Sequence, residues 1–118
     1  MAFLAHFCFF LVLFAMSISL SDATTNSVTL FVGSSVEISC ASPLVPPMWS
    51  WVGVKQTKAK TLAFSGSQPH PNLNDQRFQF SQTGSSYILK LSRVKEADAG
   101  TFNCQGDSMQ QTLLTVIR

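Results

Sequence analysis

The sequence predicts an all-β fold in which two antiparallel sheets pack face to face. Between Val28 and Ile117, short apolar runs with a period of two alternate with turn-rich segments, which is typical of β-sandwiches. Cys40 and Cys104 occupy inward positions on strands far apart in the sequence. Such side chains meet when two sheets lie about 10 Å apart with their apolar faces together. Beyond the amino-terminal segment, no stretch has a helical period.

Residues 1–23 are predicted to be a secretory signal peptide. A nearly unbroken apolar run from Phe7 to Ile18 is shorter than the roughly 20 residues that span a bilayer. Ser21 and Ala23 then supply the small residues expected before a signal-peptidase cut. Only the amino terminus and His6 supply positive charge before the apolar run, and an uncleaved membrane anchor is the alternative interpretation. Cleavage would leave residues 24–118 as one exported domain with no membrane span.

The cysteine count predicts one disulfide in that domain. Cys8 would leave with the signal peptide, so Cys40 and Cys104 remain as an even pair in an oxidising compartment. In the chain-entropy model, closing a loop of this length stabilises the folded state by about 4 kcal/mol.

The first half of the domain contains four expected strands. An apolar run comes first and is stopped by Gly33, and the next run alternates cleanly, with Val36, Ile38 and Cys40 facing inward. The next segment contains three prolines and is expected to be a loop, because proline has no amide hydrogen to donate to a sheet. The third strand carries two tryptophans on one face, and a polar turn separates it from a short fourth strand. These strands are expected at residues 28–32, 36–40, 48–54 and 61–64.

The second half begins with an exposed connection at residues 65–76, which are rich in Ser, Gly, Pro and Asn. Alternating apolar residues then mark three strands, and a β-branched run marks the last one. These strands are expected at residues 77–80, 87–91, 101–104 and 112–117.

The motifs on these strands resemble a variable-type (V-set) immunoglobulin domain. Trp51 follows Cys40 by eleven residues, and the run from Asp98 to Cys104 is similar to the family's Asp-x-Gly-x-Tyr-x-Cys. The resemblance extends from Val28 to Ile117 and implies a Greek-key sandwich. It also implies that Trp51 packs on the Cys40–Cys104 bridge. Trp49, on the same face of its strand, is the alternative for that role.

Further residue roles follow from the resemblance. Arg77 is similar to the family's arginine that pairs with an aspartate, here Asp98, to close one end of the sandwich; two solvated charges are the alternative. Phe102 replaces the family's tyrosine, so it keeps the packing role in the core without the hydroxyl hydrogen bond. The short loop around Gly106 and the missing Gly-x-Gly in the last strand argue against an antigen-receptor chain.

Composition argues against catalysis and cofactor binding. After signal removal His70 is the only histidine and no free thiol remains, so no base–nucleophile pair or metal-ligand set is expected. Eight Lys and Arg against five Asp and Glu give this domain a net charge of +3, with no basic arm for nucleic acid.

The resemblance instead implies a secreted, extracellular recognition module in immunity or cell adhesion. Its expected partner is an extracellular protein or glycan, and a second copy of the chain is another candidate. Because no apolar span follows the last strand, we expect a free domain; the amino-terminal piece of a longer membrane receptor is the alternative.

The expected binding surface is the sheet that contains the tryptophan strand, residues 60–64 and the last two strands. Three lysines at a turn form a second candidate site, for an acidic partner or glycan, or else a charged hairpin tip that keeps a sheet edge soluble. The candidate residues are Ser50, Val52, Asn103 and Gln105 on the sheet, and Lys55, Lys58 and Lys60 at the turn.

Overall fold

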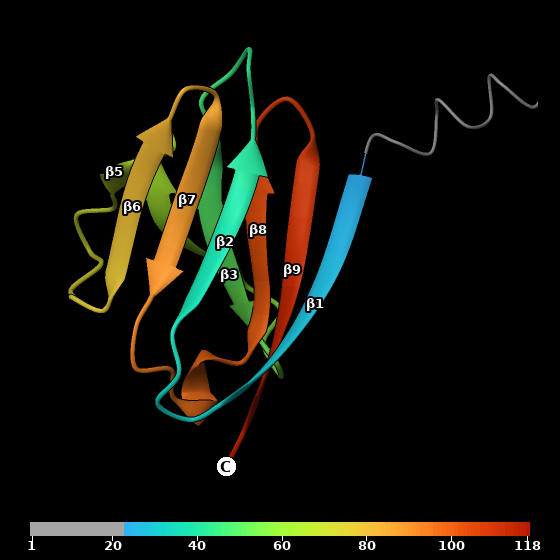
Figure 1. The fold of residues 1–118 in the computed structure, drawn as a ribbon, viewed down its shortest axis with the longest axis vertical. Helices are drawn as coiled ribbons and strands as arrows, with labels where there is room; N and C mark the ends of the chain where they lie inside the picture. Colours follow the sequence, from blue (N-terminus) through green and yellow to red (C-terminus); the bar gives the residue numbers. More distant parts are fainter. Residues whose placement is uncertain (1–22) are drawn as a thin grey trace, which may run out of the picture.

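The computed structural model describes residues 23–118, which form a two-layered β-sandwich (Figure 1). The predicted fold class is therefore confirmed. The predicted signal peptide lies outside the described residues except for Ala23, where strand β1 (Ala23–Phe31) begins.

Nine strands are present in the described part of the chain, and they divide into a six-stranded sheet and a three-stranded sheet. Sheet A has the order β1-β9-β8-β3-β4-β5, and sheet B has the order β2-β7-β6. The strands after β1 are β2 (Val36–Ala41), β3 (Met48–Gly53), β4 (Lys60–Phe64), β5 (Gln68–Pro69), β6 (Phe78–Thr83), β7 (Ser86–Leu91), β8 (Gly100–Gln105) and β9 (Met109–Ile117).

Every strand expected from the sequence is present, but three features differ from expectation. Residues 65–76, expected to be only a connection, contain the short edge strand β5, which pairs with β4. A 3-10 turn, η2 (Glu96–Asp98), precedes β8. β1 is longer than expected and runs parallel to β9, although antiparallel sheets were expected. Since no hairpin connects β1 to β9, nothing in their connection requires the antiparallel direction.

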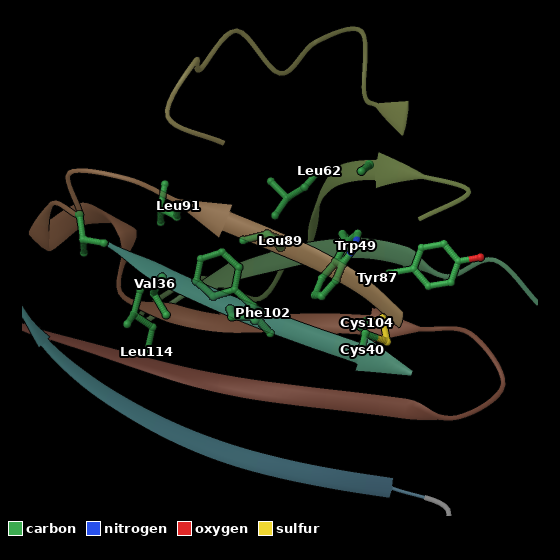
Figure 2. Packing of buried hydrophobic residues seen from close by; sticks show 13 residues of the cluster. Val36, Cys40, Trp49, Leu62, Tyr87, Leu89, Leu91, Phe102, Cys104 and Leu114 are labelled. Carbon is green, nitrogen blue, oxygen red and sulfur yellow. A yellow bond between two sulfur atoms is a disulfide. The ribbon is translucent and has the colours of Figure 1, made fainter. Parts of the chain in front are cut away.

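The disulfide joins the two layers, as predicted. Cys40 lies on β2 of sheet B and Cys104 on β8 of sheet A, and the two residues are 64 positions apart with Cα atoms 6.4 Å from each other. Both side chains lie in one buried apolar cluster filled from the two sheets (Figure 2). The largest fully buried side chains of this cluster are Trp49, Phe102, Leu62, Leu89, Leu91 and Leu114.

The assignment of Trp51 as the tryptophan at the disulfide is wrong, because Trp49 occupies that place. Trp49 is 0% exposed, it is the cross-strand partner of Cys104, and its indole N–H donates to the carbonyl oxygen of Gly66 at 3.2 Å. Trp51 pairs with Phe102, one pleat further along β3, and is only partly buried. The spacing of the two tryptophans from Cys40 does not reveal this register, because it is set by the pairing of β3 with β8.

The glycine of the run from Asp98 to Cys104, Gly100, is required by the backbone at that position. Its φ of +151° is one that side-chain-bearing residues rarely adopt, and an added Cβ would lie 2.2 Å from the carbonyl oxygen of Val52. The glycine thus allows the backbones of β3 and β8 to approach closely at the start of β8, where Gly53 pairs with Gly100.

Candidate functional site

The outer face of sheet A is the candidate binding surface. Ladder pairing aligns residues of successive strands into rows, and one such row runs Thr61–Ser50–Asn103–Gln111–Thr25 across five strands. The next row joins Val52, Thr101, Leu113 and Ser27.

All four sheet residues predicted from the sequence lie on this outer face. Ser50 and Val52 project from β3, whereas Asn103 and Gln105 project from β8 next to it. Ser50 is almost fully covered, with 9% of its surface exposed, so it contributes little direct contact area. The structure thus brings these residues together, with Asn103 near the centre.

The outer face of the four strands β1, β9, β8 and β3 carries no charged side chain among residues 25–118. By contrast, the outer face of sheet B includes Glu37 and Lys90, which are cross-strand partners. The interior of protein–protein interfaces is depleted in charged residues, because buried charges must be desolvated. The outer residues of sheet A are Met48, Ser50 and Val52 on β3, Thr101, Asn103 and Gln105 on β8, Met109, Gln111, Leu113, Thr115 and Ile117 on β9, and Thr25, Ser27, Thr29 and Phe31 on β1.

Apolar side chains are exposed on this face, and a buried polar atom of Asn103 has no hydrogen-bond partner among the described residues. Met48, Leu113, Ile117 and Phe31 are all exposed. The side-chain oxygen of Asn103 is buried and accepts no hydrogen bond from the described residues. Leaving a buried acceptor unpaired costs about 1–3 kcal/mol, and because the protein itself covers this oxygen, a docking partner does not reach it.

At one end of the sandwich, Asp107 in the β8–β9 loop holds the proline loop at residues 42–47. Its carboxylate accepts the backbone N–H of Leu44 at 3.0 Å and that of Val45 at 2.8 Å. The Ser42 hydroxyl also donates to this carboxylate at 3.1 Å, and it accepts the Asp107 N–H at 3.0 Å. Leu44 is 86% exposed, so the loop presents an apolar tip on a backbone that the carboxylate has fixed.

At the opposite end, Arg77 forms the ion pair with Asp98 that the family resemblance implies. Its guanidinium makes two hydrogen bonds to Asp98, at 2.7 and 3.0 Å, and two to Asp75, at 3.1 and 2.8 Å. The Arg77 and Asp98 side chains are only 10% and 12% exposed, so two solvated charges are not what the structure shows. Trp51 completes this end, since its indole N–H donates to the backbone oxygen of Asp98 at 3.0 Å.

The fold, the inter-sheet disulfide and this arginine–aspartate closure agree with one protein family. The family model of the immunoglobulin V-set domain matches residues 23–117. The chain belongs to the immunoglobulin V-set family. V-set domains are typically extracellular recognition modules that bind other proteins, and they typically have no enzymatic activity.

The three lysines of the V-set domain do not form a single hairpin tip. Lys55 and Lys58 lie in the exposed β3–β4 turn, whereas Lys60 opens β4 as the cross-strand partner of Trp51. Lys60 also lines a hollow of about 170 Å³ together with Trp51, Asp75 and Asp98. The lysines therefore extend from the turn toward the Arg77 network.

Two features bear on other classes of function. Within the part of the chain that the structure describes, no group of three His, Cys, Asp or Glu side chains is placed to hold a metal ion. Residues 23–118 also contain no helix with the length and hydropathy needed to cross a membrane.

The sequence did not reveal that Asp75 and Asp107 hold the loops at the two ends of this V-set domain. Asp75 stands two residues before Arg77, and this proximity was an available signal for a shared network. Asp107 contacts Ser42 across 65 positions of sequence. No local pattern connects these two residues, because only the packing of the strands brings their loops together.

Proposed function

We propose that this V-set domain is an extracellular recognition module that binds a protein partner through the outer face of sheet A. The observation that carries the proposal is the absence of charge on the outer face of four adjacent strands, combined with exposed apolar side chains on the same face. A partner with a matching surface covers this face without desolvating an ion.

The geometry of the face favours a protein over a glycan as the occupant. Its central row consists of uncharged polar side chains, and exposed apolar side chains lie on the same face, a mixture typical of contacts between proteins. Met48 and Met109 lie in one row with Gln105, and methionine side chains adapt to varied partner surfaces. The roles consistent with such a contact are immune recognition and cell adhesion.

Two features support an extracellular location. Residues 1–23 have the sequence pattern of a signal peptide, and a buried disulfide between the sheets persists in oxidising compartments. The same face serves a free secreted domain or the outermost domain of a longer receptor. Immunoblotting of cells and medium distinguishes these: a secreted free domain is lighter than the 12.9 kDa full chain, whereas a receptor is larger and membrane-bound.

The test is a binding screen with a matched pair of variants. The secreted domain, multimerised on a carrier, is screened against an array of extracellular proteins, with its own monomer as one member of the array. Leu113→Glu places a carboxylate on the outer face of sheet A and should weaken binding to the captured partner at least tenfold. Ile88→Glu places the same charge at an outward, partly exposed position of sheet B and should leave binding unchanged.

The binding results of the two variants together test the proposed face. If the sheet B variant abolishes binding and the sheet A variant binds normally, the proposed face is wrong. Binding only to the domain's own monomer, checked by sedimentation velocity, assigns the same face to a homodimer.

A further inference from the structure

Charge in this protein is concentrated at one end of the sandwich, which we call the lower end after its position in Figure 1. The lower end comprises the loops at residues 32–35, 54–59, 70–77 and 92–99 together with Lys60 and Arg118. It carries seven cations and three carboxylates, which is a net charge of +4. These residues are Lys55, Lys58, Lys60, Arg77, Arg93, Lys95 and Arg118, with Asp75, Glu96 and Asp98.

All three carboxylates at the lower end are already paired with arginines. Asp75 and Asp98 bind Arg77, and Glu96 binds Arg118. Five cations therefore remain without a carboxylate partner among the described residues: Lys55, Lys58, Lys60, Arg93 and Lys95. All five residues are exposed, so their charge faces solvent.

The two loops that carry most of these cations leave the same end of neighbouring strands. β3 ends at Gly53, and its cross-strand partner Gly100 is the first residue of β8. Lys55 and Lys58 follow directly after Gly53, and Arg93 and Lys95 lie shortly before Gly100. The close backbone approach at Gly100 keeps these loops adjacent.

The remainder of the described chain reinforces this polarity. Besides Glu37 and Lys90, which are cross-strand partners on sheet B, the only other charge is Asp107 at the opposite end. The Asp107 carboxylate is already bonded to Ser42, Leu44 and Val45. An anion approaching the lower end thus meets a concentrated positive field that no neighbouring free carboxylate opposes.

We propose that the lower end binds a sulfated polysaccharide. The unpaired cations lie on two loops and a strand end, so a chain of repeating anionic groups engages several at once, whereas a single phosphate reaches few. Between Lys55 and Lys58 stand Gln56 and Thr57, whose side chains hydrogen-bond to sulfates and sugar hydroxyls. The lysine turn has no aromatic anchor of the kind with which peripheral proteins enter lipid.

The experiment measures binding of the secreted chain to immobilised heparin as a function of NaCl concentration. Wild-type protein should remain bound at about 0.15 M salt, where the Debye length is about 8 Å. Lys55→Gln, Lys58→Gln and Lys60→Gln combined should weaken binding at least tenfold. The slope of log affinity against log salt should become shallower by roughly one for each lost contact, by analogy with phosphate contacts.

A control with the same net charge separates a local site from a general charge effect. Ser81→Glu, Thr83→Glu and Ser85→Glu combined also lower the net charge by three, but on exposed positions in or beside the β6–β7 hairpin. This control should retain heparin binding. Equal loss in both triple variants, or unchanged binding in the lysine variant, would overturn the proposal.

Two further probes separate the sources of anionic charge. Chemically desulfated heparin should bind at least tenfold more weakly than heparin, and equal binding to both contradicts the requirement for sulfate. Binding to phosphatidylserine vesicles without binding to heparin would assign the lower end to a membrane surface instead. Because the lysines lie off the outer face of sheet A, the lysine variant should keep the protein partner, so failure of one proposal leaves the other testable.

Discussion

Arg77 is the single side chain that joins the most elements at the lower end of the sandwich. Its guanidinium reaches Asp75 in its own loop, Asp98 in η2 and the backbone oxygen of Arg93. The hydrogen bonds to Asp98 and Asp75 raise the pKa of Arg77, so its charge persists at every accessible pH. Its side-chain hydrogen bond also lowers the pKa of Asp75 below 3.8. Solvent screening reduces the free energy that exposed ion pairs contribute, but the Arg77–Asp98 pair is largely buried.

The lowered pKa of Asp75 predicts a specific loss of stability in acid. A carboxylate whose pKa is lower in the folded state stabilises that state above its unfolded pKa, and the stabilisation disappears as the pH falls through the folded pKa. The urea concentration at the unfolding midpoint should therefore decrease as the pH is lowered below about 4. In the Asp75→Asn variant this decrease should be smaller. Glu37→Gln, which removes a carboxylate outside the network, is the control and should keep the wild-type slope.

The two tryptophans of β3 should differ in their contribution to the free energy of unfolding. Trp49→Ala empties a fully buried site beside the disulfide and should cost about 3–5 kcal/mol. Trp51→Ala removes a partly buried ring with one hydrogen bond and should cost clearly less. Chemical denaturation of both variants measures the difference. A larger loss for the Trp51 variant would restore the tryptophan assignment made from the sequence.

At the scale of elements, the loops at the upper end are ordered by each other rather than by their own sequences. The proline loop bonds to the β8–β9 loop through Asp107, and the Pro47 oxygen accepts the N–H of Gly66 at 2.6 Å. The Ser42 N–H donates to Ser85 in the β6–β7 turn. Three connections from both sheets thus fix the apolar tip at Leu44 before any partner is bound.

Removal of the Asp107 carboxylate should loosen this loop without unfolding the domain. Asp107→Ala leaves the backbone amides of Leu44 and Val45 without their acceptor. Their hydrogen exchange should therefore become about tenfold faster, which corresponds to the loss of one hydrogen bond with a net contribution of about 1.4 kcal/mol. Core amides of β7 and β8 should exchange as in the wild type. Asp107→Asn, which keeps one acceptor oxygen, should show a smaller effect. Unchanged exchange at both loop amides would show that the prolines alone order the loop.

At the scale of the whole molecule, the domain has two sheet layers and two separate candidate binding surfaces. The disulfide links the two layers through β2 and β8. The uncharged outer face of sheet A is proposed to bind a protein and the cationic lower end a polyanion, so the two proposed ligands do not compete for the same surface. A domain this small has a narrow margin of stability, and one covalent link forms a large part of it.

Removing the disulfide should therefore destabilise the whole domain. Cys40→Ala combined with Cys104→Ala should lower the free energy of unfolding by about 4 kcal/mol from chain entropy, with a further loss from the emptied core volume. Differential scanning calorimetry of the secreted protein measures the change. A melting temperature equal to that of the wild type would contradict the stabilising role of this bridge.

The sequence by itself determined the sandwich, every strand except the short edge strand β5, the cysteine pair and the sheet that carries the candidate face. These depend on period-two alternation and on motifs such as Asp98 to Cys104, which are local and can be read along the chain. Only the tertiary structure decided which tryptophan meets the disulfide, that β1 runs parallel to β9, and that Asp107 bonds to Leu44 and Val45. Register and loop contacts depend on how distant strands slide past one another. That alignment is a property of the packed core, to which many residues contribute together, and no local pattern encodes it.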